Sequence, residues 1–434
     1  MISYQLSKPR LYETILFIAL LSGPPRLRVR DPLASLSGDA DWSVLLSATV
    51  WGLAALWLFL NLGGHLLKGK SIPRFGPLHI LAFMLIICLY LSTLASAAPL
   101  LTFYRVSQVL IAVLFGFFWV RRFGVDSTLR HLLAGYIVMS LAIAVSAIIA
   151  PDLVFVGREG TRLRGDAIST TGYVTVMGLI LLLSNPMISM HTRALARATP
   201  YLLVVALLFT LLVMSESRTA FIAMLVFVLL AFVRPPASIS LRSFLYILLV
   251  LIPVVVWFGW TSTIFEGAVR DEKSVSTLSD RTPLWQYTMS ETLEESPLLG
   301  LGFFANRATT TAYNELLGTS HSAYIEIFSG GGILSFSIFA ILLVAEMFLV
   351  VKLFLLHGVN PKVFAVVSLF LTSLILGTTS EEMVIASPTS FTFWILLSLI
   401  PEITLMVSPK TQGGGIGTNQ NGSSSSRILP AARR

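Results

Sequence analysis

The chain has 434 residues, of which 55% are hydrophobic and 12% are charged, with a mean hydropathy of +0.82 and a formal net charge of +8. This composition excludes an ordinary soluble domain. The apolar runs are long and continuous, whereas barrel strands would alternate over about 10 residues. The sequence therefore predicts an all-α polytopic membrane protein.

We predict about twelve transmembrane helices in a single domain over residues 1–407, followed by a flexible cytoplasmic tail at 408–434 that is rich in Gly and Ser. The predicted spans are 11–22, 43–66, 76–97, 99–120, 129–150, 168–187, 200–215, 218–234, 243–260, 322–351, 361–379 and 386–407. The first run is short for a span and could be a signal-peptide core. We keep it as a span because no small-residue cleavage site follows it.

The basic residues predict the orientation of these spans. With both termini inside, more than half of the 30 Lys and Arg residues fall on the cytoplasmic side, and the connections after spans 2, 4, 6, 8 and 10 are short and basic. Arg26, Arg28 and Arg30 are exceptions on the outside. The long loop 261–321, between spans 9 and 10, is then external and more acidic than basic. The overall positive charge therefore reflects membrane topology rather than nucleic-acid binding.

Histidine placement singles out His321, because the other five histidines fall at inner ends of spans or in inner loops. An imidazole can accept a proton near neutral pH, which suits a general base. A helix-capping or interfacial histidine is the structural alternative.

Several arginines also fall on the predicted outer face. Arg218 follows a tight turn between spans 7 and 8, where a charge at membrane depth suggests a functional site and snorkelling to headgroups is the alternative. Planar guanidinium groups suit paired phosphate oxygens, although pairing with nearby acids explains them nearly as well. The further candidates on outer loops or span ends are Arg105, Arg158, Arg162, Arg164 and Arg281.

The external loop contains a predicted amphipathic helix. Thr282 suits the N-cap and Pro283 the first helical position, and the pattern ends near residues 296–297. Apolar residues recur at every fourth position, at 285, 289 and 293, so this helix could lie on the membrane surface with Arg281 at its entrance.

An external histidine and several external arginines match what transfer from a diphosphate lipid requires. The arginines can offset charge on the departing diphosphate, and the histidine can take a proton from an attacking hydroxyl. The single cysteine, Cys88, allows no disulfide or thiolate cluster within one chain, and no metal-ligand spacing or phosphate loop is visible. We therefore predict metal-independent chemistry without a cofactor.

Three motifs in order resemble the O-antigen ligase and Wzy-type polymerase superfamily. They are Ser-Glu-Ser-Arg-Thr-Ala at 215–220, Arg-Thr-Pro-Leu-Trp at 281–285 leading to Pro-Leu-Leu-Gly-Leu-Gly at 297–302, and His-Ser-Ala-Tyr-Ile-Glu at 321–326. Order and topology agree over residues 200–345. Ser322 stands where many relatives have Asn, so a role for an amide there does not carry over. Gly330, Gly331 and Gly332 allow close helix packing or local unwinding.

The resemblance implies a GT-C-like glycosyltransferase of the bacterial inner membrane, with undecaprenyl-diphosphate-linked glycan as donor at the periplasmic face. By this resemblance Arg218 and Arg281 bind the diphosphate, and His321 activates the acceptor hydroxyl. Arg164 resembles a family Arg-Gly element. Arg105, Arg158 and Arg162 join it as candidates for substrate binding, as do motif members Ser217, Tyr324 and Glu326.

The acceptor stays open between two related reactions. A ligase passes a finished glycan to lipid A core, whereas a polymerase joins repeat units to each other. A transporter or lipid-linked glycan flippase is an alternative of a different class, as is a structural membrane subunit. Transporters place polar residues along a path within the spans, whereas the span centres here read as clean, which favours the enzyme.

Overall fold

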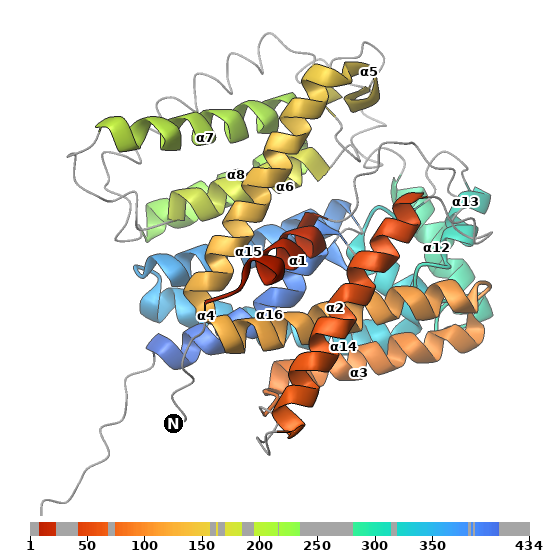
Figure 1. Cartoon of the computed structure of the whole chain (residues 1–434). Helices are drawn as coiled ribbons and strands as arrows, with labels where there is room; N and C mark the ends of the chain where they lie inside the picture. The colour runs from red at the N-terminus through yellow and green to blue at the C-terminus, as the bar shows by residue number, and fades with distance from the viewer. Residues whose placement is uncertain are drawn as a thin grey trace, which may run out of the picture.

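The computed structural model describes residues 8–22, 42–67, 74–156, 162–163, 170–184, 195–215, 217–234, 281–313, 319–380, 383–384 and 387–407. This part of the chain is a bundle of helices (Figure 1). Besides helices it contains one two-residue antiparallel pair, β1 (Phe155–Val156) with β2 (Arg162–Leu163). The all-α prediction is therefore confirmed.

The helices follow in chain order. They are α1 (Leu11–Ser22), α2 (Trp42–Leu67), α3 (Pro77–Leu91), the 3₁₀ turn η2 (Ser92–Ala95), α4 (Pro99–Ile149), α5 (Pro151–Val154), α6 (Thr170–Ser184), α7 (Leu195–Met214), α8 (Arg218–Val233), α12 (Arg281–Glu295), α13 (Arg307–Tyr313), α14 (Ala323–His357), α15 (Pro361–Thr379) and α16 (Pro388–Val407).

Among the described residues, six helices are long and apolar enough to cross a membrane: α2, α3 with η2, α4, α14, α15 and α16. Four shorter apolar helices, α1, α6, α7 and α8, accompany them. Leucine, isoleucine and phenylalanine side chains are exposed along α2, α8 and α14, as expected where a helix faces lipid. The protein is therefore a multi-pass membrane protein. Predicted span 243–260 lies outside the described residues, and the count of twelve stays a prediction.

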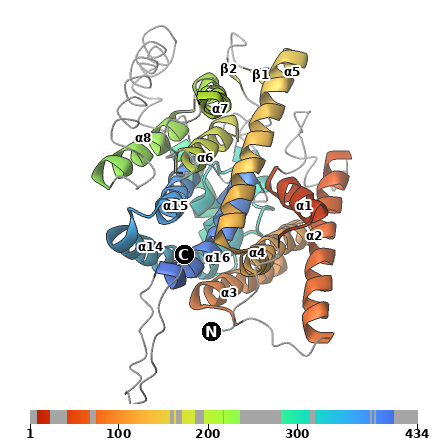
Figure 2. The same cartoon turned by 60° about the vertical axis from the view of Figure 1, so that its left-hand side comes forward.

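Three helices form the centre of the bundle. Every described residue of α6 is buried, as are residues 389–400 of α16, and α15 is buried along most of its length. A helix that is apolar on all sides belongs in an interior. Helix α15 packs against α6, α8, α14 and α16, while α16 packs against α4 (Figure 2). These central helices give the surrounding elements a fixed frame.

The first apolar run is an integral part of the bundle. Phe17 of α1 lies 4.6 Å from Trp119 of α4, between ring centroids, and 5.4 Å from Phe391 of α16. Glu13 is fully buried, with an ion pair to Arg122 at 3.2 Å. A buried carboxylate needs such a partner, because its desolvation is costly. Helix α1 therefore packs as a structural element of the membrane domain.

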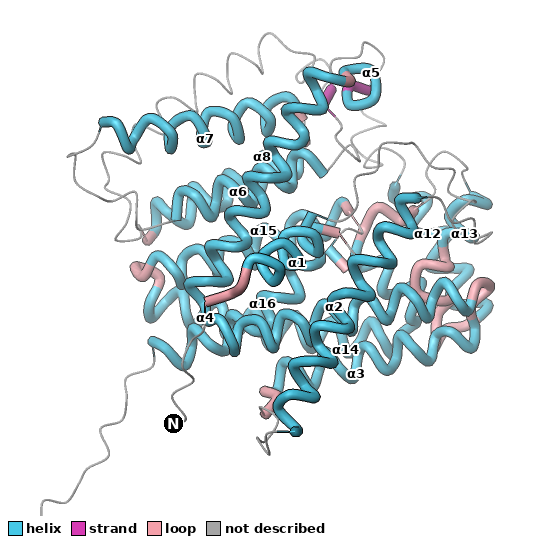
Figure 3. The backbone as a smooth tube through the Cα atoms, viewed as in Figure 1, coloured by secondary structure: helices cyan, strands magenta, loops and turns pink. Residues whose placement is uncertain are grey.

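Predicted spans 99–120 and 129–150 are joined without a loop. Helix α4 covers both and changes direction at Gly124, whose φ of 80° lies in the left-handed region (Figure 3). Glycine adopts this conformation without steric cost because it has no Cβ. The predicted boundary at 120–129 is wrong in detail, because both flanks of Gly124 are helical.

The bundle has two polar ends. At one, which we call the Asp126 end, Lys362 forms an ion pair with Asp126 at 2.7 Å and Arg234 donates to the carbonyl of Leu355. The other, which we call the Thr379 end, brings together α12, the start of α14 and the end of α15. Basic residues predicted inside thus gather at the Asp126 end, opposite the motif residues predicted outside.

A glycine-rich loop is inserted into a break in α14. The break is at Gly332, with a φ of 67°. Amide groups of Leu301 and Gly302 donate to the carbonyls of Ser329 and Gly330, at 2.8 and 3.1 Å. The loop therefore takes up carbonyl groups that the interrupted helix leaves without their usual partners. Local unwinding, predicted as one of two outcomes for the three glycines, is confirmed at Gly332.

We expect Gly332→Ala to lower the free energy of unfolding by about 3 kcal/mol, because a Cβ there strains a left-handed backbone and overpacks the loop. That Cβ would lie 2.4 Å from the carbonyl carbon and oxygen of Leu298. Gly52→Ala is the matched control, since a Cβ at Gly52 meets nothing within 4 Å. Thermal melting of the purified proteins in detergent measures the difference. Equal melting temperatures would contradict the packing argument.

Candidate functional site at the Thr379 end

The tight turn before α8 is built by two serine hydroxyls. Ser215 Oγ donates to the carbonyl of Leu212 at 2.7 Å and accepts from the amide of Ser217 at 3.3 Å. Ser217 Oγ accepts from the amide of Ala220 at 3.4 Å and so caps the helix. Arg218, the first residue of α8, is exposed. The turn thus fixes the position from which this guanidinium reaches outward.

Thr379, the last residue of α15, joins three elements. Its hydroxyl lies 2.8 Å from Thr219 Oγ1 of α8 and 3.3 Å from Tyr173 Oη of α6. Its carbonyl accepts a hydrogen bond of 3.1 Å from Arg281 Nη1 of α12. Arg281 therefore lies within two hydrogen bonds of Thr219, the residue next to Arg218. Arg281 of α12 is thus held close to the start of α8, the helix that Arg218 begins, although the two arginines are more than sixty positions apart in the sequence.

His321 lies in a backbone segment held by α12 and α14. Trp285 Nε1 donates to the carbonyl of Ser320 at 2.7 Å. His321 itself is half-buried and has a φ of 50°. A non-glycine residue in the left-handed region is uncommon, and such strain is found at functional sites more often than elsewhere. Because Trp285 belongs to α12, its hydrogen bond ties the backbone next to His321 to the helix that begins at Arg281.

The face of α12 differs from the prediction. Its buried side chains are Leu284, Thr288 and Thr292, so the apolar residues at 285, 289 and 293 lie on an adjacent face, with Leu293 49% exposed. The helix also begins at Arg281, two residues before the predicted first helical position at Pro283, so Thr282 is not its N-cap. Two of the buried residues are threonines, whose hydroxyls bond to the carbonyl four positions back, so hydrophobic periodicity alone could not find this face.

Glu326 is fully buried in the first turn of α14. Its carboxylate accepts from the amide of Phe304 at 3.2 Å, from Asn306 Nδ2 at 3.2 Å and from Ser320 Oγ at 3.3 Å. These donors belong to the protein, so the structure favours a positioning role for Glu326 over the substrate contact that we predicted. It holds the segment that carries His321 against the loop after α12.

The other predicted residues divide into two groups. Tyr324 is half-buried and donates to the carbonyl of Leu374 at 3.0 Å, which ties α14 to α15. The backbone of Arg162 lies in β2, whereas Arg158 and Arg164 lie outside the described residues. These three arginines therefore stay predictions as binding groups.

Sequence reasoning missed Thr379, Thr219 and Tyr173, the residues that join the elements at this end. Thr219 follows Arg218 within the first motif, and Thr379 ends a span on the predicted outer face. Polar residues at outer span ends were the available signal. It is weak, because threonine is common at helix ends.

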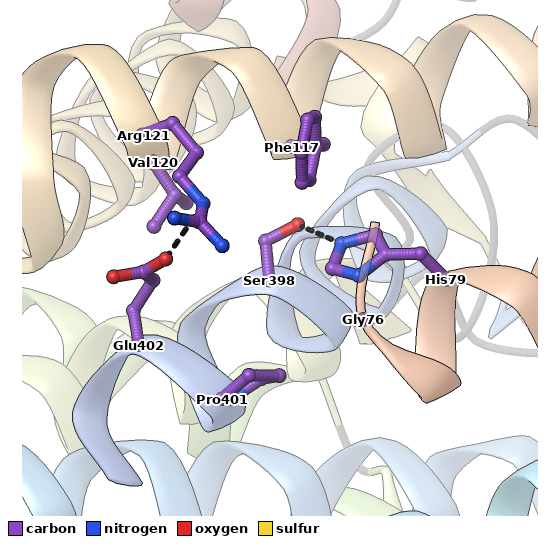
Figure 4. A pocket seen from close by; sticks show the side chains of 8 residues that line it. All are labelled: Gly76, His79, Phe117, Val120, Arg121, Ser398, Pro401 and Glu402. Carbon is purple, nitrogen blue, oxygen red and sulfur yellow. Dashed lines mark hydrogen bonds and ion pairs between the residues drawn. The ribbon is translucent and has the colours of Figure 1, made fainter. Parts of the chain in front are cut away.

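A small cavity lies away from these residues, between α3, α4 and α16. Its volume of about 20 Å³ has room for a water molecule, and Figure 4 shows His79, Arg121, Ser398 and Glu402 around it. Arg121 pairs with Glu402 at 2.7 Å, and His79 Nε2 lies 2.9 Å from Ser398 Oγ. This cavity is too small for a lipid headgroup, so the Thr379 end is the better candidate for the substrate site.

These features define the class: a polytopic helical membrane protein with arginines and a strained histidine gathered at one end of the bundle. The family described as O-antigen ligase (Wzy_C) matches residues 203–340, which include α8, α12 and the start of α14. The match confirms, for this part of the chain, the resemblance drawn from the motifs. Comparison with curated proteins gives no match.

Proposed function

We propose that this protein transfers or polymerises a surface glycan from undecaprenyl diphosphate, without a metal ion, at the periplasmic face of the bacterial inner membrane. Both termini then lie in the cytoplasm, and the Thr379 end faces the periplasm. The proposal includes a GT-C-like arrangement of about twelve spans with the loop 261–321 outside. The short basic connections at the Asp126 end support this orientation.

The observation that carries the proposal is the junction at Thr379. Arg281 donates to its carbonyl, and Thr219, next to Arg218, bonds to its hydroxyl. Arg281 is anchored on this residue and Arg218 begins the helix that contacts it, and two such guanidinium groups would suit the paired oxygens of a diphosphate. We assign Arg218 and Arg281 to the departing undecaprenyl diphosphate, where they would offset the charge that develops as the glycosidic bond breaks.

His321 is then assigned as the general base for the acceptor hydroxyl. An imidazole can take the proton from the acceptor hydroxyl as that oxygen attacks the anomeric carbon of the donor glycan. The bond between this carbon and the diphosphate oxygen breaks, and undecaprenyl diphosphate leaves with the electron pair. The segment that carries His321 is fixed by Trp285 on one side and Glu326 on the other, through Ser320.

A transporter or flippase is the second candidate, and one observation favours it. The span centres are less clean than the sequence suggested, because Glu346 is fully buried within α14 and neither carboxylate oxygen has a hydrogen-bond partner among the described residues. A buried ionisable group in a span can mark a transport path. The prediction that clean span centres favour an enzyme over a transporter is thus weakened.

The experiment that tests the proposal is transfer of radiolabelled glycan from undecaprenyl diphosphate in membranes of a strain lacking this protein, with and without the wild-type chain. Products are resolved by size, in the presence and absence of lipid A core. Glycosidic bonds that form only when this protein is present would support the enzymatic function. A ladder that forms without lipid A core identifies a polymerase, and a product that needs lipid A core identifies a ligase. Unchanged glycan with altered sidedness would support the flippase instead.

A further inference from the structure

A second pair of arginines meets on one aromatic ring. The guanidinium carbon of Arg105, in the second turn of α4, lies 4.1 Å from the ring centroid of Phe304, and that of Arg307, at the start of α13, lies 3.7 Å from it. The two arginines are about 200 positions apart in the sequence. Both distances are short for a cation over an aromatic face. Two full positive charges are thus held together by one side chain.

The geometry around this ring is fixed by the protein. The backbone of Phe304 has a φ of 72°, and its amide donates to Glu326. Arg105 Nη1 donates to Gln108 Oε1 at 3.0 Å, and Gln108 Nε2 donates to Tyr104 Oη at 3.0 Å. Two guanidinium groups that both lie over one ring carry like charges and repel each other, and an anion that contacts both would relieve the repulsion. Such a fixed pair of guanidinium groups is suited to binding a phosphate.

The segment that carries His321 is linked to elements of both arginine pairs. On one side, α12 begins with Arg281 and holds Ser320 through Trp285. On the other, Ser320 Oγ and the amide of Phe304 donate to the same carboxylate, that of Glu326. The segment carrying the histidine is therefore linked by short hydrogen-bonded paths to both arginine pairs. A reaction between two anionic lipids requires two anion sites around one base.

We propose that Arg105 and Arg307, held on Phe304, bind the phosphate of the acceptor lipid, while Arg218 and Arg281 bind that of the donor. This inference rests on the proposed transferase function. Two acceptors share the required chemistry, namely a second glycan linked to undecaprenyl diphosphate and a lipid A core. The site would position the acceptor and leave proton transfer to His321.

The test measures binding of two probe lipids, undecaprenyl diphosphate and lipid A, to the full-length protein in phosphatidylcholine nanodiscs by native mass spectrometry. We expect wild type to bind one undecaprenyl diphosphate through Arg218 and Arg281, together with a second phosphate lipid. Arg105→Gln and Arg307→Gln should each weaken the second binding event about tenfold or more and leave the first unchanged. Arg307→Lys should bind with intermediate affinity, because it keeps the charge but loses the planar fork.

Arg130→Gln is the matched control, since Arg130 is an exposed arginine beyond Gly124 on the same element, α4. Melting temperatures equal to wild type show that the variants are folded. If undecaprenyl diphosphate fills both sites, the acceptor is a lipid-linked glycan. If lipid A fills the second, the acceptor is a lipid A core. Both results support the inference.

Two results would overturn the proposed acceptor site in different ways. Second-site binding that is equal in wild type, Arg105→Gln and Arg307→Gln would remove the acceptor site and leave the donor site intact. Absence of undecaprenyl diphosphate binding to wild type would contradict the proposed function itself, and the acceptor site with it.

Discussion

Replacing His321 with asparagine should lower glycan transfer by about 10²- to 10⁴-fold, the contribution that a general base typically makes. Asparagine is chosen because it tolerates the left-handed backbone, with a φ of 50°, that His321 adopts. Its amide cannot accept a proton near neutral pH. The substitution therefore removes the base without adding backbone strain, and initial rates with radiolabelled donor measure the loss.

His357→Asn is the matched control for this variant. His357 is the last residue of α14, at the opposite end of the helix that begins just after His321. Its substitution should leave the transfer rate within about twofold of wild type, since it is remote from the Thr379 end. Wild-type activity in His321→Asn, at equal protein level, would eliminate His321 as the base.

The second large effect is expected from the arginines at Thr379. Arg218→Gln and Arg281→Gln should each lower the transfer rate by about 10²- to 10³-fold, because each removes a donor aimed at charge that develops on the diphosphate. The double variant should lose less than the product of the two effects, since the groups act on one leaving group. Rates at saturating acceptor measure the effects.

Arg281→Lys sharpens this test. Lysine keeps the positive charge but lacks the planar fork, so it should restore only a small part of the rate. Arg130→Gln, an exposed arginine far along α4, again serves as the control and should behave as wild type. If Arg218→Gln and Arg281→Gln both transfer glycan at the wild-type rate, the diphosphate site lies elsewhere.

Much of the secondary structure could be predicted from the sequence. The span 361–379 coincides with α15, and the amphipathic helix of the loop begins two residues before its predicted start. Apolar runs and helix-start signals are local, so a single sequence carries them. The buried face of α12 could not be predicted in the same way, because two of its three buried residues are threonines.

The candidate site also contains residues that the sequence could identify and residues that it could not. The sequence singled out His321 and Arg218 beside predicted outer ends of spans, and Arg281 at the entrance of the predicted external helix. Their supporting residues did not stand out, because Thr379 and Phe304 carry no charge and gain their importance from the groups that meet on them. Glu326 was assigned to the substrate, and only its complete burial among protein donors favours a positioning role instead.

The sequence by itself determined that this is a helical membrane protein and where most of its described helices lie. The physical reason is local: in a bilayer each backbone amide and carbonyl must be satisfied within its own segment, so a long apolar run becomes a helix. Only the tertiary structure decided that Thr219 and Arg281 meet at Thr379, and that Arg105 and Arg307 meet on Phe304. Those contacts join residues up to about 200 positions apart, and they depend on how the helices pack rather than on the period of any one of them.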